Sequence, residues 1–497
     1  MPFHRPIYSS DQIRQLEKQY ADIALMERAG LAISNYVQHL LPDLSSSILL
    51  LAGPGNNGGD AMVAARLLRD IYPVTIVQCG DINRLPPDAK QAYAAWLESG
   101  GEVLNAIPDG QFDLVVDGLL GIGINKVLEG HIAELVAQMN RLNTHVLAID
   151  IPSGLCAKTG RILGDAVRAD WTMTFLGLKS GLFTLDGPDH AGEIILETLG
   201  IEPDAKPAGY LLEQEDVAAF LPKRRRNSNK GSFGNVGVLG GAAQMTGAAV
   251  IAARAALLSG AGRVYAGLLA PHAPKFDVMV PELMVRAGED IFDQGSFDCL
   301  VVGPGMGQSA SAKSLLKQAI STDMTLLLDA DALNMLASDQ LLQTLCHDRH
   351  AANIVTPHPG EAARMLSSTV AEVQADRIAA ALQIAKKYHA ITALKGCGTV
   401  IATPAADWYI NHSGNPGLAS AGMGDALAGI IAALVAQKMS PEQATLLGVH
   451  IHGAAADALV EQGIGPIGLT ASEVMMEVRR ILNQWAEWGK HDQAGKT

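Results

Sequence analysis

The sequence predicts an α/β protein with two domains, each built on a parallel sheet that helices cover on both faces. Strand patterns alternate with helical patterns along both halves of the chain, which is typical of βαβ units. The length of 497 residues exceeds that of one ordinary domain. Hydrophobic residues make up 48% of the chain and aromatic residues only 5%, which favours many short strands and helices of small residues.

The first half begins with an amphipathic stretch over residues 10–41, whose apolar residues recur at helical spacing. Strands are predicted over residues 48–51, 74–78, 112–116 and 145–149. Helices are predicted over residues 61–69, 88–98 and 131–142.

The second half repeats the alternation after a segment over residues 205–231 that is rich in Pro, Lys, Arg and Asn. We therefore place the domains at 1–215 and 225–490. Strands are predicted over residues 236–239, 263–268, 299–302, 325–328 and 353–355, with a hairpin over 391–408. Helices are predicted over residues 246–259, 424–437 and 441–461.

Charge and composition exclude several classes of function. The net charge is −14, so phosphate neutralisation offers little affinity for nucleic acid. The one basic run, residues 223–226, is short, and we interpret it as a solvated linker between the domains. No apolar run reaches the length of about 20 residues that a membrane span needs.

The compartment is predicted from the cysteines and the first residues. The five cysteines form no CxxC pair and indicate reduced thiols rather than disulfides or a zinc site. The first 20 residues have no apolar segment of the kind found in signal peptides. We therefore expect a cytoplasmic protein.

Three loops of the first domain follow predicted strands and carry polar groups to one edge of the sheet. They are GPGNNGGD at 53–60, DGLLGIGINK at 117–126 and DIPSG at 150–154. Glycines let backbone N–H groups approach an anion, although a tight turn capped by Asp60 is the alternative. Oxygen ligands from Asn57, Asp117 and Ser153 suit a hard cation, whose identity the residues leave open.

The second domain has its strongest signal in the loop GNPGLASAGMGD at 414–425, which leads into a helix. Backbone N–H groups of residues 422–425 would form an anion hole for a transferring phosphoryl group. Asp425 would orient or deprotonate a hydroxyl, whereas a capping role is the alternative. The chain has no GxxxxGK[ST] loop, so nucleotide binding would use another architecture.

Other loops of the second domain follow strands at the same predicted edge. They are GPGMG at 303–307, DADAL at 329–333, TPHPGE at 356–361 and KGCGT at 395–399. His358 lies between two prolines at a strand end, which favours a functional role over a structural one. We interpret His450 and His452, in an Ala-rich helix, as packing residues.

These motifs resemble two known families. The second domain is similar to the ribokinase-like superfamily, whose GxGD loop matches GMGD at 422–425. The first domain resembles the NAD(P)HX epimerases through ALMERAG at 24–30, GPGNNGGD, the DxxxGxG loop at Asp117, and DIPSG. Their order is similar to that of the bacterial bifunctional NAD(P)HX repair enzymes over nearly the whole chain. The resemblance implies a Rossmann-like α/β/α sandwich followed by a ribokinase-like α/β domain.

The resemblance also implies the activity, which is repair of hydrated nicotinamide cofactors. The first domain would interconvert R and S NAD(P)HX. The second would dehydrate (S)-NAD(P)HX to NAD(P)H with ADP, giving AMP and phosphate; eukaryotic relatives use ATP. A potassium ion is implied for the epimerase domain, and Mg²⁺ with ADP for the dehydratase domain.

Site residues carry over from the resemblance position by position. Asp150 and Asp425 would be catalytic, and Asn57, Asp117 and Ser153 would bind K⁺. The epimerase would bind the hydrate through Asn56, Asn57, Gly58, Gly59, Asp60, Gly121, Ile122, Gly123, Ile124, Asn125, Lys126, Val127 and Asp150. The dehydratase would bind the hydrate through Ala248, Gly305, His358 and Asp425, and the nucleotide through Lys395, Gly396, Cys397, Gly398, Thr399 and Gly424.

Two alternatives remain at this point. A small-molecule kinase fits the second domain equally well, and the first domain could be a non-catalytic binding module. Asp117 and Asp150 argue against the second alternative, because a retired site needs neither carboxylate. Small-molecule partners are expected, without nucleic acid or membrane. An Ala-rich helical surface permits a homo-oligomer, which we also expect, and the short linker predicts that ligand diffuses freely between the domains.

Overall fold

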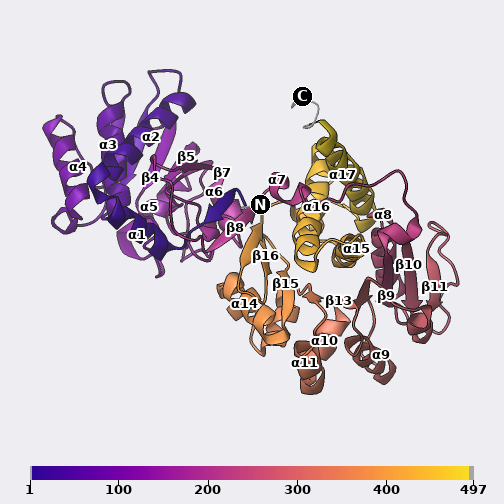
Figure 1. The fold of residues 1–497 in the computed structure, drawn as a ribbon. Helices are drawn as coiled ribbons and strands as arrows, with labels where there is room; N and C mark the ends of the chain where they lie inside the picture. Colours follow the sequence, from indigo (N-terminus) through magenta and orange to yellow (C-terminus); the bar gives the residue numbers. More distant parts are fainter. Residues whose placement is uncertain (1–2, 492–497) are drawn as a thin grey trace. The chain divides into compact units, whose positions relative to one another are not determined.

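The computed structural model describes residues 3–491, with side chains described as far as residue 486. The chain divides into two compact units, and Figure 1 shows the elements of each. The first unit runs from Pro6 to Gly209, and the second combines the residues up to Arg5 with those from Tyr210 on. The boundary differs from the predicted one because β8 (Gly209–Leu212) pairs with β17 (Trp408–Asn411) in the second unit's sheet.

The first unit has a six-stranded parallel sheet in the order β3-β2-β4-β5-β6-β7. Its strands are β2 (Ile48–Ala52), β3 (Val74–Gln78), β4 (Leu114–Gly118), β5 (His145–Ile149), β6 (Trp171–Phe175) and β7 (Glu193–Glu197). Its helices are α1 (Ser10–Gln19), α2 (Leu25–Leu40), α3 (Asn56–Leu68), α4 (Pro87–Glu98), α5 (Gly130–Met139) and α6 (Gly187–Ala191).

Alternation along β2 explains the two layers of helices in this unit. Ile48 and Leu50 belong to a core cluster with residues of α2 and α3. Leu49 and Leu51 belong to another cluster with residues of α5. Successive side chains of a strand point to opposite faces, so an all-apolar strand of this kind is buried on both sides.

The second unit has an 11-stranded sheet in the order β1-β8-β17-β16-β15-β14-β13-β12-β9-β10-β11. The strands not yet bounded are β1 (Arg5–Ile7), β9 (Asn235–Gly240), β10 (Arg263–Leu268), β11 (Met284–Ala287), β12 (Cys299–Val302), β13 (Thr325–Leu328), β14 (Asn353–Val355), β15 (Ala390–Leu394) and β16 (Thr399–Ala402). The β15/β16 and β16/β17 pairs are antiparallel, as the predicted hairpin requires.

Helices follow most of these strands. They are α7 (Gln214–Ala218), α8 (Thr246–Leu258), α9 (Ala310–Ile320), α10 (Asp331–Ser338), α11 (Gln340–His347), α12 (Pro359–Leu366), α13 (Val370–Ala375), α14 (Arg377–Tyr388), α15 (Met423–Ala436), α16 (Pro441–Glu461) and α17 (Ala471–His491). Residues of α8, α15, α16 and α17 form one large core cluster with alternate residues of β9, β12 and β13. The predicted α/β class is confirmed in both units.

The sequence analysis interpreted the basic run at 223–226 as a linker between the domains, but the run does not lie between the two units. It is an exposed segment inside the second unit, which already begins at Tyr210. Arg224 lies over the ring of Phe233 at 4.0 Å and donates a hydrogen bond to the carbonyl of Gly260 at 2.9 Å.

Two further observations concern cysteines and membranes. All five cysteines are free, as predicted. Among the helices that the structure describes between residues 3 and 491, none is both long enough and apolar enough to cross a membrane.

Candidate active sites

The three predicted loops of the first unit meet at the carboxyl edge of its sheet. Asn57, at the start of α3, donates hydrogen bonds from Nδ2 to the carbonyls of Leu120 at 2.9 Å and Ile149 at 3.0 Å. Ser153 donates from its backbone N and its Oγ to the two carboxylate oxygens of Asp117, at 2.8 and 2.7 Å. The loops after β2, β4 and β5 are therefore joined by direct contacts.

Asp117 is fully buried at the end of β4. Burial raises its pKa to about 6, although hydrogen bonds from Ser153 and Leu119 oppose the increase. No Lys or Arg side chain within residues 3–486 forms an ion pair with it. Its carboxylate is therefore balanced only by donors from Ser153 and Leu119, and a bound cation would offset the remaining charge.

Asp150 has a backbone φ of 65°, a strained conformation for a residue other than glycine. Its Oδ1 forms an ion pair with the Nζ of Lys179, whose side chain is only 1% exposed. Lys179 also donates to Thr174 Oγ1 at 2.9 Å and to the carbonyl of Phe175 at 2.8 Å. The sequence analysis missed Lys179. The signal that could have found it is its position just after a strand, at the sheet edge where the other site residues lie.

The other carboxylate oxygen of Asp150 faces the glycine loop after β4. A Cβ atom at Gly121 would lie 3.3 Å from Asn57 Oδ1 and 3.4 Å from Asp150 Oδ2. Gly121 therefore leaves open a space beside both oxygens. Of the remaining predicted loop residues, Gly123, Asn125, Lys126 and Val127 are exposed, while Ile122 and Ile124 are half-buried.

A pocket of about 230 Å³ lies in the first unit, lined by Glu17, Asn56, Asp60 and Phe175 among others. Burial raises the pKa of Asp60 well above its ordinary value, and the charges of Asp150 and Glu17 raise it further. Burial and Asp150 also raise the pKa of Glu17, which the sequence analysis did not single out. The pocket thus brings carboxyl groups near Asp150.

In the second unit the loops after β13 and β15 meet the first turn of α15. Lys395 Nζ donates to Asp329 Oδ1 at 2.9 Å. A Cβ at Gly424 would lie 3.1 Å from Lys395 Nζ and 3.7 Å from Asp329 Oδ2. Burial alone would lower the pKa of Lys395, but Asp329, Glu361 and Asp425 raise it, so the ammonium stays charged.

Asp425 lies in the first turn of α15, after Gly422 in the left-handed conformation with φ 86°. Burial raises the pKa of Asp425 to about 7, with Asp329 adding to the increase and Lys395 opposing it. A carboxylate that titrates near neutrality can accept a proton during a reaction.

Two more predicted dehydratase residues lie side by side. Gly305, with φ 55°, follows β12, and a Cβ there would lie 3.1 Å from the Cβ of Ala248 in α8. It would also lie 2.5 Å from the carbonyl of Met245, so only glycine fits at this position.

His358 caps α12. Its Nδ1 accepts from the backbone N of Gly360 at 3.0 Å, and Glu361 accepts from the backbone N of His358 at 2.8 Å. Burial and Lys395 lower the pKa of His358, and half of its side chain stays exposed. The structure therefore gives His358 a structural contact and leaves part of the ring accessible. His450 and His452 are buried, as packing residues would be.

The KGCGT turn at 395–399 connects β15 and β16, and Arg377 of α14 lies beneath it. Arg377 is 2% exposed and donates to the carbonyls of Leu394 at 3.1 Å and Lys395 at 3.3 Å. Burial lowers the pKa of Arg377 to about 10. Sequence reasoning missed this residue, because an arginine at the start of an amphipathic helix usually faces solvent.

Comparison with known proteins gives matches along nearly the whole chain. The family model described as YjeF-related protein N-terminus matches residues 22–181, and the one described as NAD(P)H-hydrate dehydratase matches residues 236–479. The bifunctional NAD(P)H-hydrate repair enzyme of Coxiella burnetii is 38% identical over 96% of this chain and 99% of its own length. The chain belongs to the family of bifunctional NAD(P)H-hydrate repair enzymes.

Other repair enzymes of this family match over similar lengths. The relative from Escherichia coli is 36% identical and covers 99% of this chain and 96% of its own length. A solved ADP/ATP-dependent NAD(P)H-hydrate dehydratase from Bacillus subtilis, co-crystallised with ATP/Mg²⁺, is 28% identical and covers 55% of this chain and 98% of its own, with a TM-score of 0.48.

Proposed function

We propose that this chain repairs hydrated NADH and NADPH at two separate sites. The first unit interconverts the R and S hydrates, and the second dehydrates the S form with ADP. The observation that carries the proposal is a carboxylate site at the carboxyl edge of each sheet, centred on Asp150 and on Asp425, in a chain that matches bifunctional repair enzymes over its length.

The dehydratase step begins with a hydroxyl, which is a poor leaving group in water. Asp425 accepts the proton of the hydrate's hydroxyl group. The oxygen of that hydroxyl attacks the β-phosphorus of ADP, and AMP is released. Backbone N–H groups of residues 422–425 and the helix N-terminus stabilise the charge on the transferring group. Phosphate then leaves with a proton from the neighbouring ring carbon, and the dihydronicotinamide is restored.

The nucleotide is held by Lys395, Gly396, Cys397, Gly398, Thr399 and Gly424, and the hydrate by Ala248, Gly305, His358 and Asp425. The charged Lys395 supplies local neutralisation of phosphate despite the acidic chain. Asp329 and Glu361 raise the pKa of Asp425, so negative charge gathers where Mg²⁺ would arrive with the nucleotide, held mainly by phosphate oxygens and water. When bound, Mg²⁺ neutralises negative charge on the nucleotide phosphates.

In the epimerase, residues 56–60 and 121–127 bind the hydrate. Asp150 accepts the proton of the hydrate's hydroxyl as the bond between the hydrated carbon and the ring nitrogen opens, and returns it when that bond re-forms on the other face. Lys179 keeps Oδ1 of Asp150 occupied, which leaves Oδ2 facing the space beside Gly121. Asn57, Asp117 and Ser153 hold K⁺, whose charge offsets that of the buried Asp117.

The test is recovery of the dihydronicotinamide's near-ultraviolet absorbance when full-length protein meets the S hydrate, ADP and Mg²⁺. Asp425→Asn should abolish the recovery. With a mixture of R and S hydrates, wild type should recover all of the absorbance rapidly and Asp150→Ala only the S share. No recovery, together with a stable phosphorylated product from another hydroxyl compound, would establish a kinase instead.

A further inference from the structure

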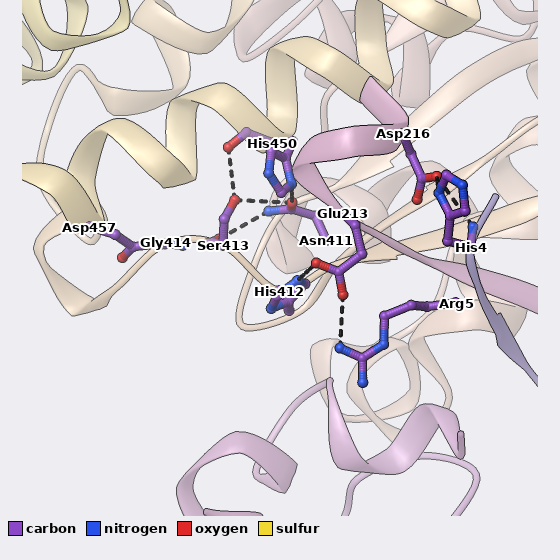
Figure 2. Close-up of polar contacts among 10 residues, drawn as sticks. All are labelled: His4, Arg5, Glu213, Asp216, Asn411, His412, Ser413, Gly414, His450 and Asp457. Carbon is purple, nitrogen blue, oxygen red and sulfur yellow. Dashed lines mark hydrogen bonds and ion pairs between the residues drawn. The ribbon is translucent and has the colours of Figure 1, made fainter. Parts of the chain in front are cut away.

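Helix α16 carries two side chains that hold the beginning of the loop leading to α15. His450 and Asp457 are seven residues apart, which is about two helical turns, so they lie on one face of the helix. Both contact the segment from Asn411 to Asn415. Figure 2 shows the contacts that involve Asn411, Ser413 and Gly414. The segment follows β17 and opens the loop that ends at Gly422.

The first set of contacts fixes the end of β17. Asn411 Oδ1 lies 3.0 Å from His450 Nδ1, and Ser413 Oγ donates to the carbonyl of His450 at 2.8 Å. Asn411 also donates from Nδ2 to the carbonyl of Ser413 at 3.0 Å. These hydrogen bonds are buried or partly buried, so the chain leaves the sheet in one defined direction.

Asp457 accepts the second set of hydrogen bonds, which come from the start of the loop. Its Oδ2 accepts from the backbone N of Gly414 at 2.7 Å, and its Oδ1 accepts from Asn415 Nδ2 at 2.9 Å. Asn415 Oδ1 in turn accepts from the backbone N of Gly417 at 3.0 Å. Hydrogen bonds to a carboxylate are short and strong, and here one carboxylate supports two loop residues directly and a third through Asn415.

Elsewhere the loop is held mainly at Gly417, which is buried beside Leu469 and Pro466, and at Leu418, which packs against the core. Residues 414–422 are Gly, Asn, Pro, Gly, Leu, Ala, Ser, Ala and Gly, and residues 419–421 are exposed. Apart from Leu418, these residues have few side-chain atoms to pack, so the loop position depends on its hydrogen bonds. The loop ends at the backbone N–H groups that the proposed mechanism places on the transferring phosphoryl group.

We propose that Asp457 is a positioning residue for the dehydratase reaction, which sets the loop from Gly414 to Gly422 and so places the anion hole. This inference rests on the proposed dehydratase activity. Asp457 acts through Gly414 and Asn415, which it contacts directly, and has no part in the chemical step itself. A loop placed wrongly by about 1 Å costs a reaction of this type about 10²-fold in rate.

The test exchanges the two partners in the full-length protein. In Asp457→Asn an amide nitrogen opposes Asn415 Nδ2, and in Asn415→Asp two carboxylates face each other. In the double variant the amide at position 457 donates to the carboxylate at position 415, and the backbone N of Gly414 keeps an acceptor. We expect each single variant to lower kcat about 10-fold to 100-fold and the double variant to recover most of the loss. Asp293→Asn, which removes an exposed charge from the same unit, should leave kcat unchanged.

Hydrogen exchange of the loop amides gives a readout that does not depend on the reaction. Exchange over residues 414–422 should quicken in Asp457→Asn and return toward wild type in the double variant. Absence of dehydration by wild type would overturn the proposed function, while the exchange data would still decide whether Asp457 fixes the loop. The positioning role is overturned if the single variants have the amide exchange and the kcat of wild type. It is also overturned if kcat of the double variant is no higher than that of the worse single variant, or if each fall in kcat only matches the loss of folded protein.

Discussion

Asp425 titrates near neutrality because burial and Asp329 raise its pKa to about 7. A general base acts in its ionised form, so kcat/KM for the S hydrate should rise with pH through about 7 and level off above it. Asp425→Asn should lower kcat by about 10²–10⁴-fold. Initial rates measured across neutral pH check both statements, and a pH profile that is flat between pH 6 and 8 would contradict the assigned role.

Lys179 is the partner that holds Asp150. Lys179→Met should lower the epimerisation rate by about 100-fold or more, because Asp150 loses the cation that orients it. Dehydration of pure S hydrate by the same polypeptide is the internal control and should not change. Lys90→Met, at an exposed lysine of the same unit, should affect neither activity. Equal loss of both activities would indicate general misfolding.

Potassium should stabilise the first unit through Asp117. A cation that binds only the folded state at 100 times its Kd adds about 2.7 kcal/mol to the free energy of unfolding. Calorimetry should therefore show a higher unfolding temperature in KCl than in tetramethylammonium chloride of equal ionic strength. Asp117→Asn should remove the difference, and an equal effect of both salts on wild type would argue against a cation site.

Some of these residues could be predicted from the sequence and others could not. Asn57, Asp117 and Ser153 follow strands that are apolar throughout, so their loops were correctly placed at one edge. Lys179 follows β6, whose sequence WTMTF alternates between apolar and polar residues, so the strand was recognisable but was not assigned. Arg377 supports the KGCGT turn from the first residue of α14, the helix that precedes β15, and this contact forms only when the helix packs back along the strand. The roles of the predicted residues stay predictions.

At the level of elements, one continuous apolar pattern in the sequence forms two separate helices in the structure. The amphipathic stretch at 10–41 was predicted as one helical pattern, but it forms α1 and α2. The first helix ends at Gln19, and Ala24, with φ 53°, is the N-cap of the second. The apolar spacing continues across the break because both helices contribute to the same core cluster. Sequence periodicity therefore located the buried face and not the turn.

Packing between α8 and α15 depends on a glycine. A Cβ at Gly429 would lie 2.1 Å from the carbonyl of Ala252, so Gly429→Ala should force the helices apart and cost about 1–3 kcal/mol. Gly247→Ala is the matched control, because that helical glycine has open space and alanine favours a helix by about 0.5–1 kcal/mol. Denaturant unfolding should show a lower free energy of unfolding for Gly429→Ala and a higher one for Gly247→Ala. Destabilisation of similar size by both substitutions would refute the packing argument.

On the scale of the whole molecule, residues 3–5 belong to the unit that begins again at Tyr210. Phe3 packs against Tyr210 and Tyr409, with ring centroids 5.3 and 4.9 Å away. Arg5 forms an ion pair with Glu213, which also contacts His412 (Figure 2). No sequence pattern predicts this arrangement, because the first strand has three residues and its partner β8 begins only at Gly209.

Phe3→Ala should therefore destabilise the second unit by about 1–3 kcal/mol and leave the first unit unchanged. Phe112→Ala, at a partly buried ring in the core of the first unit, should do the reverse. Calorimetry of the full chain, with each transition assigned by added ADP or K⁺, measures both effects. A shift of the first unit's transition by Phe3→Ala would contradict the assignment of residues 3–5.

The same arrangement has a consequence for biosynthesis. Residues 3–5 are translated before the first unit, but their partners Tyr210, Glu213 and Tyr409 are translated only after it. The first unit can close meanwhile, since the backbone N of Ala208 reaches the carbonyl of Ile7 at 2.9 Å and brings its two ends together. Residues 3–5 can therefore join the dehydratase sheet only after the epimerase domain has been synthesised.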